Sequence, residues 1–138
     1  MPYDTNNVFA KILRGDLPSV KVFEDDQTLA FMDVMPSTDG HVLVIAKEPA
    51  ETLQDLSVDG ASALIRTVQK VSAAVKKGLG VPGFMLMQLN GEAAGQSVPH
   101  IHFHIFPRVH GLDIHVHGKP LVPAEQLEPI AAKIRGAL

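Results

Sequence analysis

Three histidines alternate with large apolar residues between residues 99 and 107, where the chain reads Pro-His-Ile-His-Phe-His-Ile-Phe-Pro. Strict alternation is the period of a half-buried β-strand, in which residues i, i+2 and i+4 share one face. A strand over about residues 98–106 places His100, His102 and His104 on one face, about 7 Å apart at a rise of roughly 3.3 Å per residue. The apolar residues between them then point into a core, whereas a helix would scatter the three imidazoles around its circumference.

Three imidazoles on one strand face admit three interpretations. They can form a solvated or core-satisfied row, or they can ligate a metal ion, which requires nitrogens converging at about 2 Å from one centre. They can also act as nucleophile, proton carrier and hydrogen-bond donor near neutral pH. The third histidine of such a row lies out of reach of an ion shared by the first two. Catalysis is therefore favoured, and the other two interpretations stay open at this point.

A loop of small residues precedes the histidines. Residues 90–97 read Asn-Gly-Glu-Ala-Ala-Gly-Gln-Ser and lie between two apolar runs. Small residues let backbone N–H groups approach a ligand closely, and such loops commonly hold phosphate. Ser97 lies three residues before His100, so its hydroxyl can also face an anion. This combination favours phosphorus chemistry over a structural metal.

These residues resemble the signature of the histidine triad superfamily, His-φ-His-φ-His-φ-φ with φ apolar, and residues 95–98 match its usual Gly-Gln-Ser/Thr-Val. The resemblance extends through residues 8–12, 23–26, 30–33 and 41–45, in the order and spacing of the histidine triad nucleotide-binding proteins, and is closest to bacterial-type hydrolases of this group. It implies one domain over residues 1–138, with the triad strand at about 98–106 and a tail and helix at about 109–138.

The resemblance also implies roles for individual residues. His102 attacks the α-phosphate of a nucleotide and forms a covalent nucleotidyl-histidine intermediate. His104 contacts phosphate and handles the leaving-group proton, while His100 bonds a backbone carbonyl near His102 and holds its tautomer. The residues implied to bind the nucleotide are Phe9, Ile12, Phe31, Asp33, Val34, His41, Asn90, Gly95, Gln96 and Ser97.

Two of these positions have a simpler explanation from the residues alone. Asp33 precedes Pro36, Asp39 and Gly40, where an aspartate usually bonds the following backbone in a turn; the resemblance gives it ribose hydroxyls instead. His41 alone would be an ordinary residue at the start of a strand.

The sequence departs from the family at Leu89. The position eleven before His100 is commonly Asn or Gln, an amide near the phosphate. Neighbouring residues on a strand face opposite sides, so Asn90 replaces this amide only through a local twist; otherwise one contact is missing.

The implied substrate is a purine nucleotide such as AMP or an AMP conjugate, and the favoured reaction is hydrolysis of a nucleoside 5′-phosphoramidate. The alternatives are hydrolysis of dinucleoside polyphosphates, a regulatory module that binds nucleotides without turnover, and a zinc-dependent interaction domain. We expect no cofactor and no metal. The resemblance also implies a homodimer that extends the sheet.

Composition excludes several other classes. The 138 residues carry a net charge of −3 with no run of Lys or Arg, so no nucleic-acid surface is expected. No apolar run reaches the length of a membrane span, residues 1–7 show no leader pattern, and there is no cysteine. We therefore expect a cytoplasmic protein without a membrane partner. His110, His115 and His117 follow the triad, and for them a flexible or partner-facing segment is favoured over a metal site.

The remaining patterns predict the order of elements. We expect helices over residues 6–14, capped by Thr5 or Asn6, and over 57–77, stopped by Gly78 and Gly80. A third helix is expected over 124–137, starting or kinking at Pro129. The expected strands cover residues 20–24, 28–33, 41–46 and 84–89 in addition to the triad strand. This order predicts an α+β fold with an antiparallel sheet of about five strands, one long helix and short terminal helices.

Overall fold

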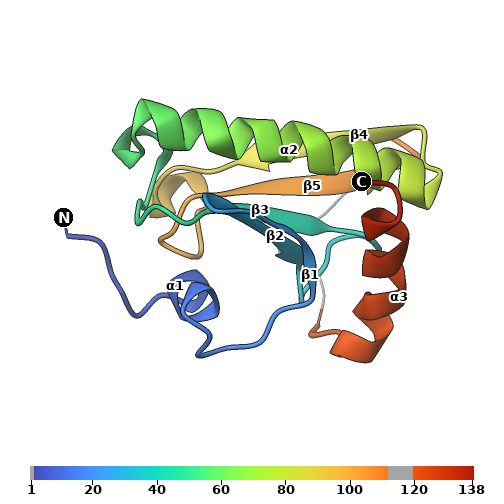
Figure 1. Cartoon of the computed structure of the whole chain (residues 1–138), viewed down its shortest axis with the longest axis horizontal. Coiled ribbons are helices and arrows are strands. Elements are labelled where there is room, and N and C mark those ends of the chain that lie inside the picture. Colours follow the sequence, from blue (N-terminus) through green and yellow to red (C-terminus); the bar gives the residue numbers. More distant parts are fainter. Residues whose placement is uncertain (1, 112–119) are drawn as a thin grey trace.

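The computed structural model describes residues 2–111 and 120–138. His115 and His117 lie outside these described residues. The elements are α1 (Val8–Leu13), β1 (Lys21–Glu24), β2 (Thr28–Met32), β3 (Val42–Ala46), η1 (Leu53–Asp55), α2 (Val58–Leu79), β4 (Gly83–Gln88), η2 (Glu92–Ala94), β5 (His102–Arg108) and α3 (Ala124–Arg135). The strands form one antiparallel sheet in the order β1-β2-β3-β5-β4 (Figure 1). The predicted fold class is confirmed.

The two faces of the sheet are covered differently. The long helix α2 lies over one face together with α3, and α1 lies on the opposite side (Figure 1). Alternation along β5 sends Phe103 and Ile105 into the core beneath α2. His102 and His104 therefore point to the side of α1, opposite Ile45 and Leu43 of β3 respectively.

The triad strand begins later than predicted. β5 starts at His102 rather than near residue 98, because Pro99 has no N–H to donate and the chain turns before the ladder begins. In this turn the His100 N–H bonds the Val98 carbonyl, and the Ile101 N–H bonds the Ala50 carbonyl at 2.9 Å. His100 therefore precedes the strand itself, but its ring lies on the same side as that of His102, because Phe9 of α1 packs against both rings and the intervening Ile101 belongs to the core beneath α2.

Helix α2 begins as predicted and ends later. The Ser57 hydroxyl caps it by accepting from the Gly60 N–H at 2.9 Å. Gly78 does not stop the helix, which runs to Leu79 and ends where Gly80 takes a left-handed φ of 63°. Gly78 instead lies where α3 crosses, since a Cβ there would collide with the Lys133 carbonyl oxygen.

The two other helices also differ at their starts. α1 is capped by Asn7, whose Oδ1 accepts from the Ala10 N–H at 2.9 Å, and not by Thr5 or Asn6. α3 begins at Ala124 and continues through Pro129. Proline cannot bond the carbonyl four residues earlier, a cost of about 3 kcal/mol, and burial of the helix's apolar face offsets it. Within the described residues, no helix has the length and hydropathy of a membrane span.

Candidate active site

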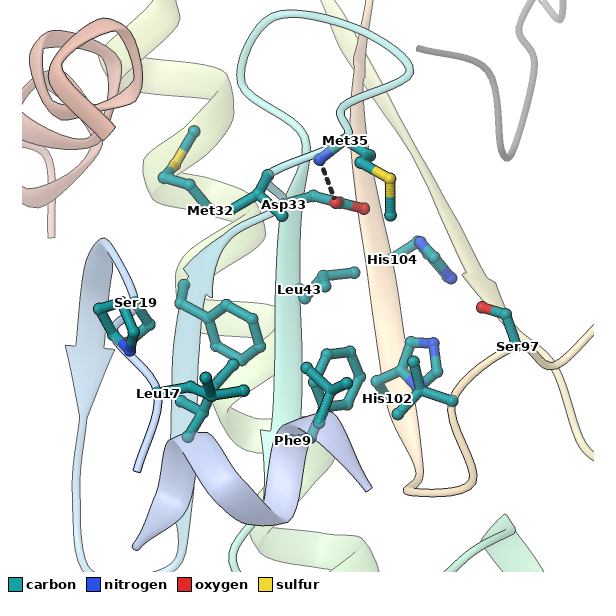
Figure 2. Close-up of a pocket in the computed structure, with 16 residues that line it drawn as sticks. Phe9, Leu17, Ser19, Met32, Asp33, Met35, Leu43, Ser97, His102 and His104 are labelled. Carbon is teal, nitrogen blue, oxygen red and sulfur yellow. Dashed lines mark hydrogen bonds between the residues drawn. The ribbon is translucent and has the colours of Figure 1, made fainter. Parts of the chain in front are cut away.

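A cavity of about 360 Å³ opens on the α1 side of the sheet, between α1 and the strands β2, β3 and β5. This volume lies in the range of roughly 300–1,000 Å³ that is typical of small-molecule sites. Figure 2 shows Phe9 rising from α1 toward His102, with His104 and Ser97 on the far side of the opening. The predicted residues that line this cavity are Phe9, Ile12, Phe31, Asp33, Val34, Ser97, His102 and His104.

The other predicted residues are not on the cavity wall: His41, Asn90, Gly95, Gln96 and His100.

Part of the cavity wall was not predicted from the sequence. Leu43 could have been found from strand alternation, because it pairs with His104 across β3 and β5. Leu17, Pro18 and Ser19 belong to an irregular segment with no periodic signal.

Gln96 braces the loop in front of the histidines. Its Oε1 accepts from the Gly91 N–H at 2.6 Å, and its Nε2 donates to the Glu51 and Val98 carbonyls at 2.7 and 3.0 Å. Gly95 takes a φ of 97°, a conformation that strongly favours glycine. The loop is therefore held by the Gln96 side chain while the next residue, Ser97, is presented at the cavity. Figure 2 shows the Ser97 hydroxyl directed toward the two imidazoles.

Asn90 does not take the place of the amide that Leu89 lacks. Its Oδ1 accepts from the Leu53 N–H at 2.8 Å, and its amide pairs with that of Gln88 at 2.8 and 2.9 Å. Asn90 thus ties the loop to η1 and lies outside the cavity wall. The sequence left two outcomes open: Asn90 replaces the amide, or one amide contact is missing. This geometry agrees with the second.

The tautomer of His102 is set by the main chain. Its Nδ1 lies 2.7 Å from the His100 carbonyl oxygen, which can only accept, so Nδ1 carries the proton. In neutral imidazole this places the lone pair on Nε2. The Phe9 ring packs edge-on against the imidazole, with centroids 4.9 Å apart. His102 therefore has a defined orientation and a nucleophilic nitrogen.

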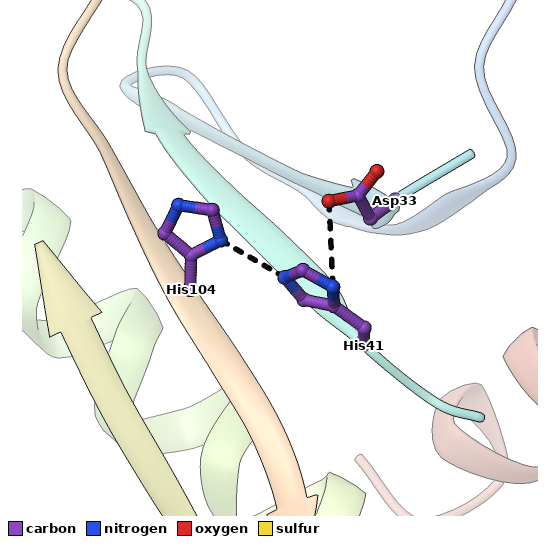
Figure 3. Close-up of side chains that lie close together, drawn as sticks. All are labelled: Asp33, His41 and His104. Atoms are coloured by element: carbon purple, nitrogen blue, oxygen red, sulfur yellow. Dashed lines mark hydrogen bonds and ion pairs between the residues drawn. The ribbon is translucent and has the colours of Figure 1, made fainter. Parts of the chain in front are cut away.

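His104 has the opposite tautomer because of His41. The Ser37 N–H donates to His41 Nδ1 at 3.1 Å, so neutral His41 holds its proton on Nε2. That Nε2–H donates to His104 Nδ1 at 2.9 Å, which leaves the His104 proton on its own Nε2 (Figure 3). His102 and His104 thus line the same cavity with an acceptor and a donor nitrogen respectively.

Asp33 is a turn residue whose side chain also lines the cavity. Its Oδ1 accepts from the Met35 N–H at 2.8 Å, as expected for a turn residue, while the side chain also lines the cavity. Its Oδ2 lies 3.4 Å from His41 Nδ1 (Figure 3). That contact is an ion pair only when His41 is protonated.

The same three side chains are the one group among the described residues that could hold a metal ion, with ligand atoms within 4.8 Å of one another. Two nitrogens bound to one tetrahedral zinc ion at about 2.05 Å lie roughly 3.3 Å apart. The observed 2.9 Å between His41 Nε2 and His104 Nδ1 is instead a hydrogen-bond distance. The geometry therefore fits a proton relay better than a metal centre.

His100 is fully buried behind the cavity. Its Nε2 donates to the Ala46 carbonyl at 2.6 Å, next to Ile45, the register partner of His102. Burial lowers the pKa of His100; the bond to Ala46 raises this pKa and the neighbouring His102 lowers it further. His100 is therefore held as a neutral ring.

Comparison with known proteins finds relatives along most of the chain. The HIT domain family matches residues 14–111. The adenosine 5′-monophosphoramidase hnt1 of Schizosaccharomyces pombe is 37% identical over 134 residues, spanning 93% of this chain and 98% of that protein. The adenylylsulfatase HINT3 of Arabidopsis thaliana is 41% identical over 101 residues, 73% of this chain and 51% of that protein. The crystal structure of a Hit-like protein involved in cell-cycle regulation from Bartonella henselae has a TM-score of 0.95 at 45% identity and 100% coverage of both chains.

The lowered pKa of His100 predicts a pH-dependent stability. The unfolded chain binds a proton at this residue near the usual 6.5, whereas the folded chain binds it only at lower pH. The contribution is therefore complete above pH 6.5 and is lost as the pH falls through that value, with a slope of up to about 1.4 kcal/mol per pH unit. Urea unfolding at pH 7.5 and 5.5, two values chosen at about one unit either side of the usual histidine pKa, should show a smaller loss of stability for His100→Gln than for the unmodified protein.

The matched control is His110→Gln, which removes an exposed histidine outside the cavity. This variant should keep the pH dependence of the unmodified protein. If the stability of the unmodified protein and of His100→Gln depends equally on pH, His100 is not the source of this pH dependence.

Proposed function

The chain belongs to the HIT domain family, and we propose that it is a nucleotide hydrolase that cleaves the P–N bond of a nucleoside 5′-phosphoramidate. The observation that carries the proposal is the pairing of opposite tautomers at one cavity, with a lone pair on His102 Nε2 and a proton on His104 Nε2. The similarity to an adenosine 5′-monophosphoramidase over nearly the whole of both chains supports the choice of substrate class.

In the first step, His102 Nε2 attacks the α-phosphorus and the P–N bond breaks. The Nδ1–H bond to the His100 carbonyl supports this step, because the ring gains positive character as the new N–P bond forms. The Ser97 hydroxyl and the imidazole N–H of His104 are the donors that we assign to the phosphoryl oxygens. The product is a nucleotidyl-histidine and a free amine.

The departing amine must gain a proton. We assign this proton to the His41–His104 pair, which starts with one extra proton. In this charged form His41 also carries a proton on Nδ1, which faces Asp33 Oδ2 and replaces the bond accepted from the Ser37 N–H, while His104 keeps its proton on Nε2. His104 Nε2 delivers the proton and the pair becomes neutral. In the second step water attacks phosphorus, the bond to His102 breaks, and the proton released by water returns to the pair. AMP leaves and the starting protonation state is restored.

The leaving group has its own space in this arrangement. Ser97 borders the main cavity and also a second hollow, of about 620 Å³, which is lined by residues of the segment before α1 and of the loop before β5. A phosphate held at Ser97 therefore has room for the nucleoside on one side and for the amine on the other. Supporting this orientation, the walls of the main cavity are largely apolar and include the T-shaped pair Phe9 and Phe31, a suitable surface for a base.

The decisive prediction concerns His102. The purified protein should hydrolyse adenosine 5′-phosphoramidate in the presence of EDTA, and His102→Ala should lower kcat by at least about 10³-fold, because the nucleophile is lost. The steady-state release of ammonia and AMP measures kcat for the unmodified protein and for His102→Ala. His110→Ala is the matched control and should keep full activity, since His110 is exposed and lies outside the cavity.

Three results of that assay separate the alternatives. Full activity in His102→Ala would overturn the mechanism. Tight binding of AMP without turnover would favour a regulatory module, in agreement with the missing amide contact at Leu89. Turnover that is abolished by EDTA and restored by zinc would favour a metal-dependent function.

A second prediction concerns the ribose. If the Asp33 carboxylate accepts hydrogen bonds from ribose hydroxyls, Asp33→Asn should weaken binding of AMP by about 10- to 100-fold, the value of a hydrogen bond to a charged group. Binding of 2′,3′-dideoxy-AMP should change by less than about threefold. Isothermal titration measures the four affinities. Equal losses for the two nucleotides would show that Asp33 acts on the turn and not on the ribose.

We also propose that two copies of the chain pair along β4. This strand is an edge of the sheet and carries Phe84 and Leu86 with 38% and 42% exposed surface. The opposite edge, β1, is covered in part by α3, whose Arg135 donates to the Lys21 carbonyl at 2.7 Å. An uncovered apolar edge favours pairing with another strand.

Sedimentation equilibrium tests this pairing. The unmodified protein should sediment at twice the chain mass of 14.9 kDa. Leu86→Lys should weaken the dimer by at least about tenfold, since it places a charge in the apolar contact. Leu121→Lys, at a residue with 71% exposed surface, is the control and should not change the mass. A monomeric unmodified protein at micromolar concentration would refute the proposal.

A further inference from the structure

Tyr3, in the segment before α1, contacts the first histidine of the triad. The Tyr3 ring packs edge-on against the His100 ring, with centroids 5.6 Å apart, and its hydroxyl lies 2.5 Å from His100 Nδ1. The Asn7 Nδ2 lies 2.8 Å from the same hydroxyl. Neither Tyr3 nor Asn7 lines the cavity, and the mechanism above uses neither of them.

The direction of these hydrogen bonds is set at both ends. Asn7 caps α1 with its Oδ1, so its amide orientation is fixed and Nδ2 faces Tyr3 as a donor. At the other end, the His100 Nε2–H donates to the Ala46 carbonyl, so Nδ1 is the acceptor nitrogen. The Tyr3 hydroxyl therefore accepts from Asn7 and donates to His100.

The protonation states of both groups maintain this direction. Burial raises the pKa of Tyr3, which keeps the hydroxyl protonated as a donor. Burial also lowers the pKa of His100, which keeps the ring neutral and its Nδ1 an acceptor. In the other tautomer of His100, a lone pair on Nε2 would face the lone pairs of the Ala46 carbonyl, and the Nδ1–H would oppose the donor of Tyr3.

We propose that Tyr3 is a positioning residue for the nucleophile: its hydroxyl locks the ring of His100, and the His100 carbonyl in turn orients His102. The link is short, because the ring that Tyr3 holds and the carbonyl that accepts from His102 Nδ1 at 2.7 Å belong to the same residue. This residue lies in a turn, where no strand ladder fixes its backbone. The kinetic part of the inference rests on the proposed function, whereas the structural part does not.

The test is Tyr3→Phe, which keeps the ring contact and removes only the hydroxyl. Two-bond ¹H–¹⁵N correlation spectra report which imidazole nitrogen carries each proton. We expect the His100 Nδ1 resonance to shift and the His102 Nδ1–H signal to broaden through exchange. For adenosine 5′-phosphoramidate we expect kcat to fall about three- to tenfold, the effect of one lost hydrogen bond, with KM unchanged within about twofold.

Two further variants make the result specific. Asn7→Asp keeps the cap of α1 but offers the Tyr3 hydroxyl a carboxylate to donate to, so it should reproduce the His100 shift and the fall in kcat. Thr5→Ala removes an exposed hydroxyl from the same segment that makes no side-chain hydrogen bond among the described residues, where only the Thr5 carbonyl accepts one, and should change neither signal nor kcat. His100→Gln identifies the His100 resonances by their loss.

Several outcomes would overturn the proposal. Unchanged His100 and His102 signals in Tyr3→Phe would refute the positioning role of Tyr3. An equal fall in kcat for Thr5→Ala would also refute it, because it would indicate a general loosening of the segment. If the unmodified protein does not turn over the substrate at all, the proposed function fails. The spectra then still decide about Tyr3: a broadened His102 Nδ1–H signal in Tyr3→Phe supports the positioning role, and an unchanged signal refutes it.

Discussion

The hydrogen bond from His102 Nδ1 to the His100 carbonyl is the contact on which the site depends, because it decides which nitrogen of His102 carries the lone pair. The His100 carbonyl belongs to the turn before β5, in which the His100 N–H bonds the Val98 carbonyl and the Ile101 N–H bonds the Ala50 carbonyl. These main-chain bonds hold the segment whose carbonyl accepts from the His102 ring.

The strand that carries the histidines and the helix beneath it could be predicted from the sequence, because both follow from local periodicity and capping. Alternation from His102 onward determined the strand and its two faces, and the Ser57 cap determined where α2 begins. The behaviour of His100 could not be predicted in the same way. Its ring is held by Ala46 and Tyr3, which lie 54 and 97 residues away in the chain, and alternation carries no information about such partners. For the same reason the helix predicted over residues 57–77 ends too early: Gly78 does not stop it but leaves room inside the helix for the backbone of Lys133.

Positions 88–90 show how strand parity limits a motif comparison. Leu89 occupies the place of the expected amide. In a strand, the side chains of Gln88 and Asn90 would both face the side opposite to that of Leu89. Their side chains pair with each other, and Asn90 also accepts from the Leu53 N–H. Asn90, one position after the expected amide, therefore braces the loop against η1. The identity of neighbouring residues alone could not have revealed that η1 provides the competing donor.

The motif supplies the imidazoles, but other segments supply their protonation pattern. A backbone N–H at Ser37 directs the proton of His41, and through it that of His104, whereas a carbonyl in the turn at residue 100 directs the proton of His102. Two chemically identical side chains on one strand face therefore present a lone pair and a proton to one cavity. The tautomer of His102 is set directly by a main-chain carbonyl, whereas that of His104 is set by a main-chain N–H acting through the His41 ring. An alternating row of histidines becomes a pair with two distinct chemical tasks only when the fold brings these separate segments against it.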